Sequence, residues 1–124
     1  MADPEKVVRE FCSAWSELDL DKIMAFFAPD AVYHNMPVDP LVGTDAIAEF
    51  IAGFTASVDR VDFEITHLAV IGSVVLTERI DTFVTGDQSV GLAVMGTFEL
   101  DGAKITAWRD YFDMAQAMTA LGMS

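Results

Sequence analysis

The chain has 124 residues, 52% of them hydrophobic, and a formal net charge of −13 at pH 7. This length fits one domain, residues 1–124, with enough apolar side chains for a core and for an apolar cavity inside it. The charge argues against nucleic acids and anionic membranes as partners, because both repel an acidic protein, although an acidic surface also simply favours solubility. No apolar run is long enough to cross a membrane and no secretory signal opens the chain, so we expect a cytoplasmic protein.

Cysteine, histidine and glycine residues give no sign of a metal or a cofactor. The single cysteine, Cys12, cannot form an intrachain disulfide and lies in a helical apolar pattern, which is typical of a buried, unreactive thiol. Neither His34 nor His67 has a second histidine at ligand spacing. The glycines form no phosphate-binding fingerprint, and no Gly-x-Ser-x-Gly motif is present. We therefore expect neither a metal nor a cofactor.

The first half of the chain has the spacing of helices. Asp3 followed by Pro4 is typical of a helix cap and a first-turn proline. Apolar residues then recur at helical spacing, at Val7, Val8, Phe11, Cys12, Trp15 and Leu18. A second, short helix is predicted to begin at Asp19 and to end before Pro29, and Thr44 can cap a third helix.

From residue 61 onward the pattern changes to strands. Alternating apolar positions indicate a half-buried strand with one face formed by Val61, Phe63, Ile65, His67 and Ala69. Further predicted elements are an extended segment over residues 31–35, strands over about 74–84, 89–100 and 103–112, and a closing helix over 115–121. Helices followed by strands are typical of an α+β fold, with N-terminal helices packed on a curved, mostly antiparallel mixed sheet that wraps a cavity as a cone.

Three charged residues stand inside runs that otherwise look buried. Arg79 and Asp81 are two residues apart and therefore share one face of a strand. Asp110 shares a face with two large aromatic residues, Trp108 and Phe112, where a carboxylate is unfavourable unless it is paired or protonated. If both faces turn toward a cavity, the arginine can bridge the two carboxylates. The competing interpretation is a surface ion pair and a solvated strand end.

Such a bridged pair has the chemistry of an acid and a base. Two carboxylates beside one fixed positive charge can share a single proton, so that one carboxyl donates while the other accepts. Tyr33 and Asn35 share a strand face and together can hold a water molecule for the accepting carboxylate. Alternatively, these two residues are only a strand end and a turn.

Three motifs of this sequence resemble the limonene epoxide hydrolase family. They are Tyr33-His34-Asn35-Met36-Pro37, Thr77-Glu78-Arg79-Ile80-Asp81 and Lys104-Ile105-Thr106-Ala107-Trp108-Arg109-Asp110-Tyr111-Phe112-Asp113. The resemblance extends from about residue 5 to residue 113. It implies the cone-shaped α+β fold that the family shares with nuclear transport factor two, ketosteroid isomerase and polyketide cyclases.

The resemblance also implies a role for each residue. Asp81 falls on the family's acid, Asp110 on its base and Arg79 on the bridge between them, while Tyr33 and Asn35 help to hold the water. The implied hydrophobic wall consists of Leu92, Val94, Trp108, Phe112, Phe54 and Val58. The implied reaction adds water to a lipophilic, terpene-like or alicyclic epoxide in one acid–base step, gives a vicinal diol, and needs neither cofactor nor metal.

Other functions fit parts of the same pattern. A ketosteroid isomerase or polyketide cyclase would use one aspartate as a base beside a carbonyl, and a non-catalytic domain would only bind a small ligand. Paired carboxylates bridged by an arginine count against both. Arg109 should face away from Asp110 and form a surface or subunit-interface salt bridge. If Leu76 and Ile80 face outward, they favour a homodimer.

Overall fold

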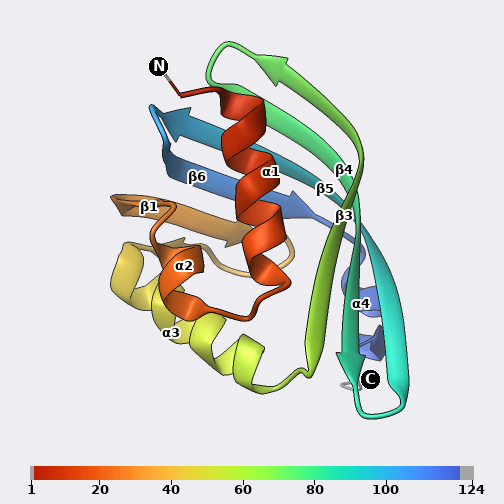
Figure 1. Ribbon diagram of the computed structural model, residues 1–124. Helices are drawn as coiled ribbons and strands as arrows, with labels where there is room; N and C mark the ends of the chain where they lie inside the picture. Colours follow the sequence, from red (N-terminus) through yellow and green to blue (C-terminus); the bar gives the residue numbers. More distant parts are fainter. Residues whose placement is uncertain (1, 121–124) are drawn as a thin grey trace.

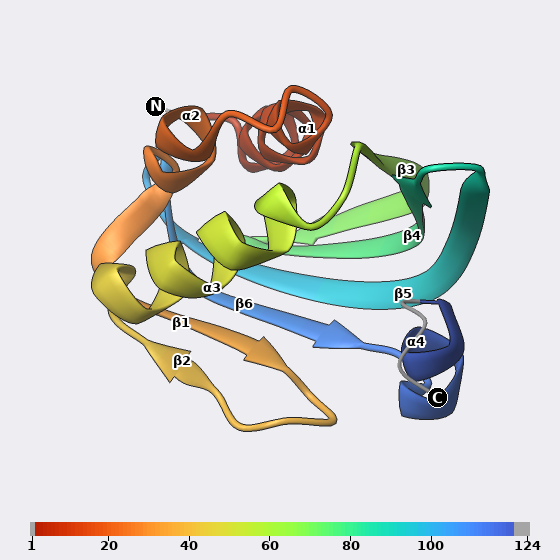
Figure 2. The same cartoon turned by 90° about the horizontal axis from the view of Figure 1, so that it is seen from below.

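Six strands form one curved sheet, and the N-terminal helices cover its concave face (Figures 1 and 2). The computed structural model describes residues 2–120. The elements in chain order are α1 (Pro4–Trp15), α2 (Leu20–Met24), β1 (Phe27–Asn35), β2 (Leu41–Val42), α3 (Thr44–Ala56), β3 (Arg60–Ile71), β4 (Val74–Thr85), β5 (Gln88–Asp101), β6 (Lys104–Tyr111) and α4 (Met114–Ala120). This arrangement confirms the predicted α+β class.

The strands lie in the order β2-β1-β6-β5-β4-β3. β1 and β6 run parallel, whereas every other neighbouring pair is antiparallel, so the sheet is mixed and mostly antiparallel as predicted. Gly86 and Gly102 stand in the two predicted turns with φ angles of 60° and 59°, which glycine adopts without strain. No helix within residues 2–120 is long and apolar enough to cross a membrane.

The main core lies between α1 and the concave face of the sheet. Phe11 and Trp15 of α1 are almost completely buried there. The ring of Phe11 lies edge-on to the rings of Phe27, Phe98 and Trp108, with centroids 5.5, 5.9 and 5.0 Å apart. Such aromatic pairs contribute about 0.5–1.5 kcal/mol each beyond the burial of their area. This aromatic layer supports the strands that carry the charged residues.

Three helix boundaries differ from the sequence prediction. α1 ends at Trp15, and Leu18, whose φ is 52°, lies beyond the helix. α2 ends at Met24 rather than before Pro29. Phe27 already belongs to β1, where it is buried beside β6, so packing against the core overrides the local helical spacing. α3 has no side-chain cap, because Gly43 occupies the N-cap position with a φ of 87° and Thr44 is already the first helical residue.

The alternation predicted for β3 breaks at a bulge between Ile65 and His67. An extra residue reverses the side-chain direction of everything that follows it. His67 is therefore exposed on the outer face, where its Nδ1 is hydrogen-bonded to Glu78 Oε1 at 2.8 Å. Leu68 instead packs against the core. The predicted inward face of this strand is correct up to Ile65 and wrong beyond it.

Aspartates cap the first and last helices. Asp3 accepts a hydrogen bond from the backbone N–H of Glu5 at 3.1 Å, which confirms the predicted cap of α1. Asp113 accepts one from the backbone N–H of Gln116 at 2.9 Å and so caps α4. The predicted end of the last helix, Leu121, lies outside the described residues.

Candidate active site

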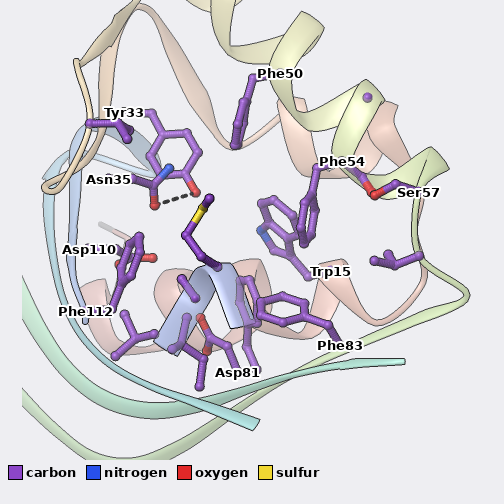
Figure 3. A pocket seen from close by; sticks show the side chains of 18 of the residues that line it. Trp15, Tyr33, Asn35, Phe50, Phe54, Ser57, Asp81, Phe83, Asp110 and Phe112 are labelled. Atoms are coloured by element: carbon purple, nitrogen blue, oxygen red, sulfur yellow. Dashed lines mark hydrogen bonds between the residues drawn. The ribbon is translucent and has the colours of Figure 1, made fainter. Parts of the chain in front are cut away.

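A cavity of about 1060 Å³ opens between α3, the concave face of the sheet and α4 (Figure 3). Five of the six residues predicted for its hydrophobic wall line it, namely Phe54, Val58, Leu92, Val94 and Phe112. Four of the predicted polar site residues reach the same space, namely Tyr33, Asn35, Asp81 and Asp110. The structure therefore brings together residues from β1, β4, β5, β6 and α3 around one apolar cavity.

Arg79 lies behind the cavity wall and donates every N–H group that a guanidinium has. Its Nε and Nη2 donate to Asp81 at 3.0 and 2.8 Å, and its Nη1 and Nη2 donate to Asp110 at 3.1 and 2.8 Å. Nη1 also donates to Thr77 Oγ1 at 3.2 Å. These bonds use all five donors, so none is left for a ligand. The geometry suits Arg79 to holding two carboxylates in fixed positions.

The two carboxylates accept unequal numbers of hydrogen bonds. Asp110 accepts two from Arg79 and a third from Trp108 Nε1 at 2.7 Å, whereas Asp81 accepts two, both from Arg79. Because donors stabilise the charged form, Asp110 is the better stabilised carboxylate. Burial raises the pKa of Asp81 to about 6, against the opposing effect of Arg79. Burial therefore favours the protonated form of Asp81.

The charged cluster is buried among aromatic rings. The side chains of Arg79, Asp81 and Asp110 are 0%, 5% and 6% exposed. The guanidinium carbon lies 5.0 Å from the centre of the Phe63 ring and 6.0 Å from that of Trp108. Burial alone would lower the pKa of Arg79, but the charges of Asp110 and Asp81 and their hydrogen bonds raise it well above its usual value. Arg79 therefore stays positively charged.

Tyr33 and Asn35 stand on β1 beside the end of β6. The parallel register pairs Tyr33 with Trp108 and Asn35 with Asp110. The Tyr33 ring stacks on Trp108 at 4.1 Å between centroids, and its hydroxyl donates to Asn35 Oδ1 at 3.3 Å. Burial raises the pKa of Tyr33, and the charge of Asp110 adds to this effect, so the phenol stays neutral. The Tyr33 oxygen can still accept a hydrogen bond, and the Asn35 amide nitrogen can still donate one.

The neighbouring Trp108 and Arg109 lie outside the cavity. Trp108 was predicted to line the wall, but it is fully buried, and the stacked ring of Tyr33 lies against one of its faces. It contributes a hydrogen bond to Asp110 rather than a contact surface. Arg109 faces the other side of the strand and donates to Glu99 at 2.6 Å, which confirms the predicted surface salt bridge.

Two residues without a predicted role shape the charged cluster. Thr77 is fully buried, and its hydroxyl accepts from Arg79 Nη1 and donates to the backbone oxygen of Gly96 at 3.3 Å. A Cβ atom at Gly96 would clash with Arg79 Nη1 and lie 2.6 Å from Asp110 Oδ1. A glycine inside a strand is a known sign of such a close approach, and it is the signal that could have identified Gly96.

Comparison with solved structures identifies the fold class. An NTF2-like protein of unknown function from Burkholderia pseudomallei matches with a TM-score of 0.84 and 18% identity, covering 98% of each chain. An LEH-like epoxide hydrolase from Mycobacterium tuberculosis matches with a TM-score of 0.80 and 33% identity, covering 95% of this chain and 88% of that chain. The protein thus has the NTF2-like α+β fold, as the sequence motifs implied.

Sequence comparison narrows the class to a family. The family model of the limonene-1,2-epoxide hydrolase catalytic domain matches residues 2–122. Epoxide hydrolase EphG of Mycobacterium tuberculosis is 35% identical over 109 residues, which cover 86% of this chain and 71% of that protein. The chain therefore belongs to the limonene-1,2-epoxide hydrolase family. It is an epoxide hydrolase of that type.

Gly96→Ala tests how closely the sheet must approach the charged cluster. The added methyl group would push against the guanidinium of Arg79 and the carboxylate of Asp110. We expect kcat/KM for epoxide hydrolysis to fall by about 100-fold, because a displacement on the order of 1 Å is enough to disturb a positioned catalytic group. Initial rates of diol formation measure the loss.

Gly91→Ala is the matched control on the same strand. Its Cβ atom would meet the exposed Ile80 side chain at 3.2 Å and Thr82 Oγ1 at 3.8 Å, both on the outer face of the sheet. We expect its rate to stay within about twofold of the wild type, as for most exposed substitutions. Equal losses in the two variants would contradict a specific role for Gly96.

Proposed function

We propose that this epoxide hydrolase adds water to a lipophilic, terpene-like or alicyclic epoxide in one acid–base step and releases a vicinal diol. The main support for this proposal is the guanidinium of Arg79, whose five N–H groups all donate within the protein. It holds two carboxylates with unequal hydrogen bonding at the wall of an apolar cavity. Such a pair offers an acid and a base at the same pH. The family resemblance and the positions of Tyr33 and Asn35 support the same assignment.

Asp110 acts as the base in the proposed reaction. A water molecule binds beside Tyr33, Asn35 and Asp110, which lie together on one side of the cavity (Figure 3). The water donates one hydrogen to Asp110 and the other to the Tyr33 oxygen, and it accepts a hydrogen bond from the Asn35 amide. Its remaining lone pair attacks an epoxide carbon while Asp110 takes the proton.

Asp81 acts as the acid. As the carbon–oxygen bond of the epoxide breaks, neutral Asp81 gives its proton to the departing oxygen, which becomes the second hydroxyl of the diol. The proton now on Asp110 returns to Asp81 through solvent, and the enzyme is ready again. Arg79 keeps its charge throughout, so the cluster holds one proton before and after the reaction. General acid catalysis and general base catalysis by such positioned groups each typically raise the reaction rate by about 10²–10⁴-fold.

The cavity wall favours a lipophilic substrate. Apolar side chains from both helices and strands face the space, including Phe54 of α3, Phe83 of β4 and Leu92 of β5. Each substrate CH₂ group buried against such a wall is stabilised by about 0.8 kcal/mol. The volume of about 1060 Å³ is at the upper end of ordinary ligand pockets and accommodates an alicyclic ring with substituents.

Hydrolysis of limonene 1,2-epoxide in heavy-oxygen water tests the one-step reaction. With enzyme in excess, we expect the diol of the first turnover to carry the label, because water attacks carbon directly. We also expect Asp81→Asn and Asp110→Asn each to lower kcat/KM by at least about 10²-fold, since each removes one proton-transfer group. Mass spectrometry of the diol and initial rates provide the measurements.

Asp101→Asn serves as the matched control, because Asp101 is an exposed carboxylate at the end of β5, just before the turn to β6. An unlabelled first-turnover diol would indicate a covalent ester with a protein carboxylate and would contradict the one-step reaction. If no diol forms from a broad panel of epoxides, a ketosteroid isomerase-like or cyclase-like reaction, or ligand binding alone, replaces the proposal.

The rate should fall as the pH rises. The acid must be protonated, and burial raises the pKa of Asp81 to about 6, so the reactive form dominates below that pH and declines above it. We expect kcat/KM to fall by roughly tenfold per pH unit on the alkaline side. A kcat/KM that is constant between about pH 5 and 8 would contradict the assignment of Asp81 as the acid.

The proposed protein partner is a second copy of the chain. Ile80, Met95 and Tyr111 form an outer-face patch and are 37%, 49% and 46% exposed. Met95 and Tyr111 are direct neighbours across β5 and β6, and Ile80 lies on the adjacent β4. A two-fold dimer through this patch would bury the apolar side chains of both copies at once.

Met95→Glu tests the dimer. A buried, unpaired carboxylate is unfavourable in an apolar interface, so we expect the variant to sediment as a monomer while the wild type sediments as a dimer. Val42→Glu is the control, because Val42 is 67% exposed on the edge strand β2, away from the outer-face patch. A wild-type protein that is monomeric at micromolar concentration would rule the dimer out.

A further inference from the structure

The two oxygens of the Asp110 carboxylate accept different numbers of hydrogen bonds. Oδ1 accepts one from Arg79 Nη1 at 3.1 Å and another from Trp108 Nε1 at 2.7 Å. Among residues 2–120, Oδ2 accepts from Arg79 Nη2 alone, at 2.8 Å. Because a carboxylate oxygen has two lone pairs, both lone pairs of Oδ1 are occupied, whereas one lone pair of Oδ2 is free. A water molecule in the cavity therefore finds one acceptor position on this carboxylate.

The packing around Trp108 fixes the direction of its N–H group. β6 lies between β1 and β5, and the register places Tyr33 and Phe98 directly beside Trp108. The rings of Tyr33 and Phe98 both stack on the indole, with centroids 4.1 and 5.4 Å away, and Phe11 of α1 lies edge-on to it at 5.0 Å. The indole is fully buried among these rings, so its N–H stays directed at the carboxylate.

Trp108 also supports the phenol beside the proposed water site. The planes of the Tyr33 and Trp108 rings are only 6° from parallel. The Tyr33 hydroxyl donates to Asn35 Oδ1 at 3.3 Å, and Figure 3 shows Tyr33, Asn35 and Asp110 together on one side of the cavity. One indole thus holds the base by a hydrogen bond and the phenol by stacking, and it sets the position of each relative to the other.

We propose that Trp108 is a positioning residue of the hydrolysis: it occupies Oδ1 of Asp110, so that Oδ2 is the atom that takes the proton of the attacking water. This inference rests on the proposed function, in which Asp110 is the base. As the O–H bond of the water breaks, the proton goes to Oδ2 and the water oxygen forms its bond to the epoxide carbon. Trp108 acts only through its neighbours, because it is fully buried behind the cavity wall.

Trp108→Phe tests this role, because it removes the N–H group and keeps an aromatic ring on which Tyr33 can stack. Without the indole donor, Oδ1 regains a free lone pair, and water can bind there in an unproductive position. We expect kcat for limonene 1,2-epoxide to fall by roughly 10- to 100-fold, as for the loss of a hydrogen bond to a charged group. KM should stay within about twofold, because the indole does not contact the substrate. Initial rates over a range of substrate concentrations give both constants.

Trp15→Phe is the matched control. Trp15 is the other tryptophan of the chain, is 2% exposed, and lies in the same aromatic layer with its ring 5.8 Å from that of Trp108. Its Nε1 has no acceptor among residues 2–120, so this substitution removes the same atoms from the core without removing a hydrogen bond. We expect a clearly smaller loss of kcat than in Trp108→Phe. Equal losses would overturn the proposal, because a loss of packing would then explain both.

An Asp110→Asn background separates positioning from packing. If Trp108 acts through Asp110, Trp108→Phe lowers kcat in the wild-type background and leaves the residual kcat of Asp110→Asn unchanged. The same fold-loss in both backgrounds would indicate a purely structural role and would overturn the proposal. If Asp110→Asn keeps the wild-type rate, Asp110 is not the base and the proposed function fails. If Asp110→Asn is slow but Trp108→Phe is not, only the role of Trp108 is refuted.

A spectroscopic measurement does not depend on turnover or on the folding of Trp108→Phe. The chain has two tryptophans, so its proton–nitrogen spectrum contains two indole N–H signals, which Trp15→Phe assigns. Because a hydrogen bond to a carboxylate is strong, we expect the Trp108 signal to lie far downfield of the Trp15 signal and to move upfield in Asp110→Asn. A Trp108 signal that coincides with that of Trp15, or that Asp110→Asn leaves in place, would overturn the proposal.

Discussion

The rest of the structure depends on one buried guanidinium whose hydrogen bonds are all made within the protein. Arg79 joins β4 to β6 across β5, and this is possible only because Gly96 of β5 has no side chain between them. Thr77 Oγ1 accepts a hydrogen bond from the one N–H group of Arg79 that does not donate to an aspartate. The approach of three strands, the position of a glycine and the direction of two carboxylates are therefore consequences of the same five hydrogen bonds.

A buried ionic cluster of this kind contributes little net stability, because desolvation offsets most of the attraction between its charges. Its role is instead to give the two aspartates different numbers of hydrogen bonds. Asp110 receives an additional hydrogen bond from Trp108, while Asp81 faces the cavity with only the bonds from Arg79. Two residues with the same chemical group thereby have different hydrogen-bond surroundings within a single apolar space.

Local patterns in the sequence predicted the order of the elements and the shared face of Arg79 and Asp81, because strand parity depends only on neighbouring residues. Nearness to Asp110 depends on the register of three strands, which periodicity alone does not determine, and the family resemblance supplied it. Trp108 shows what strand alternation cannot predict. Alternation identifies the face of the sheet on which a side chain lies, but it does not show whether a neighbouring side chain covers it. Trp15 matched a helical core pattern, and only the fold reveals that its N–H lacks an acceptor.

The parallel pairing of β1 with β6 also affects how the protein matures. The hairpins from β3 to β6 join neighbouring segments and can form early, whereas β1 must wait for a strand near the other end of the chain. During synthesis, the apolar residues of β1 therefore stay without their partner strand until most of the chain has emerged from the ribosome. We expect fragments that end before β6 to expose this strand and the unpaired side of Arg79, and to be targets for chaperones and proteases.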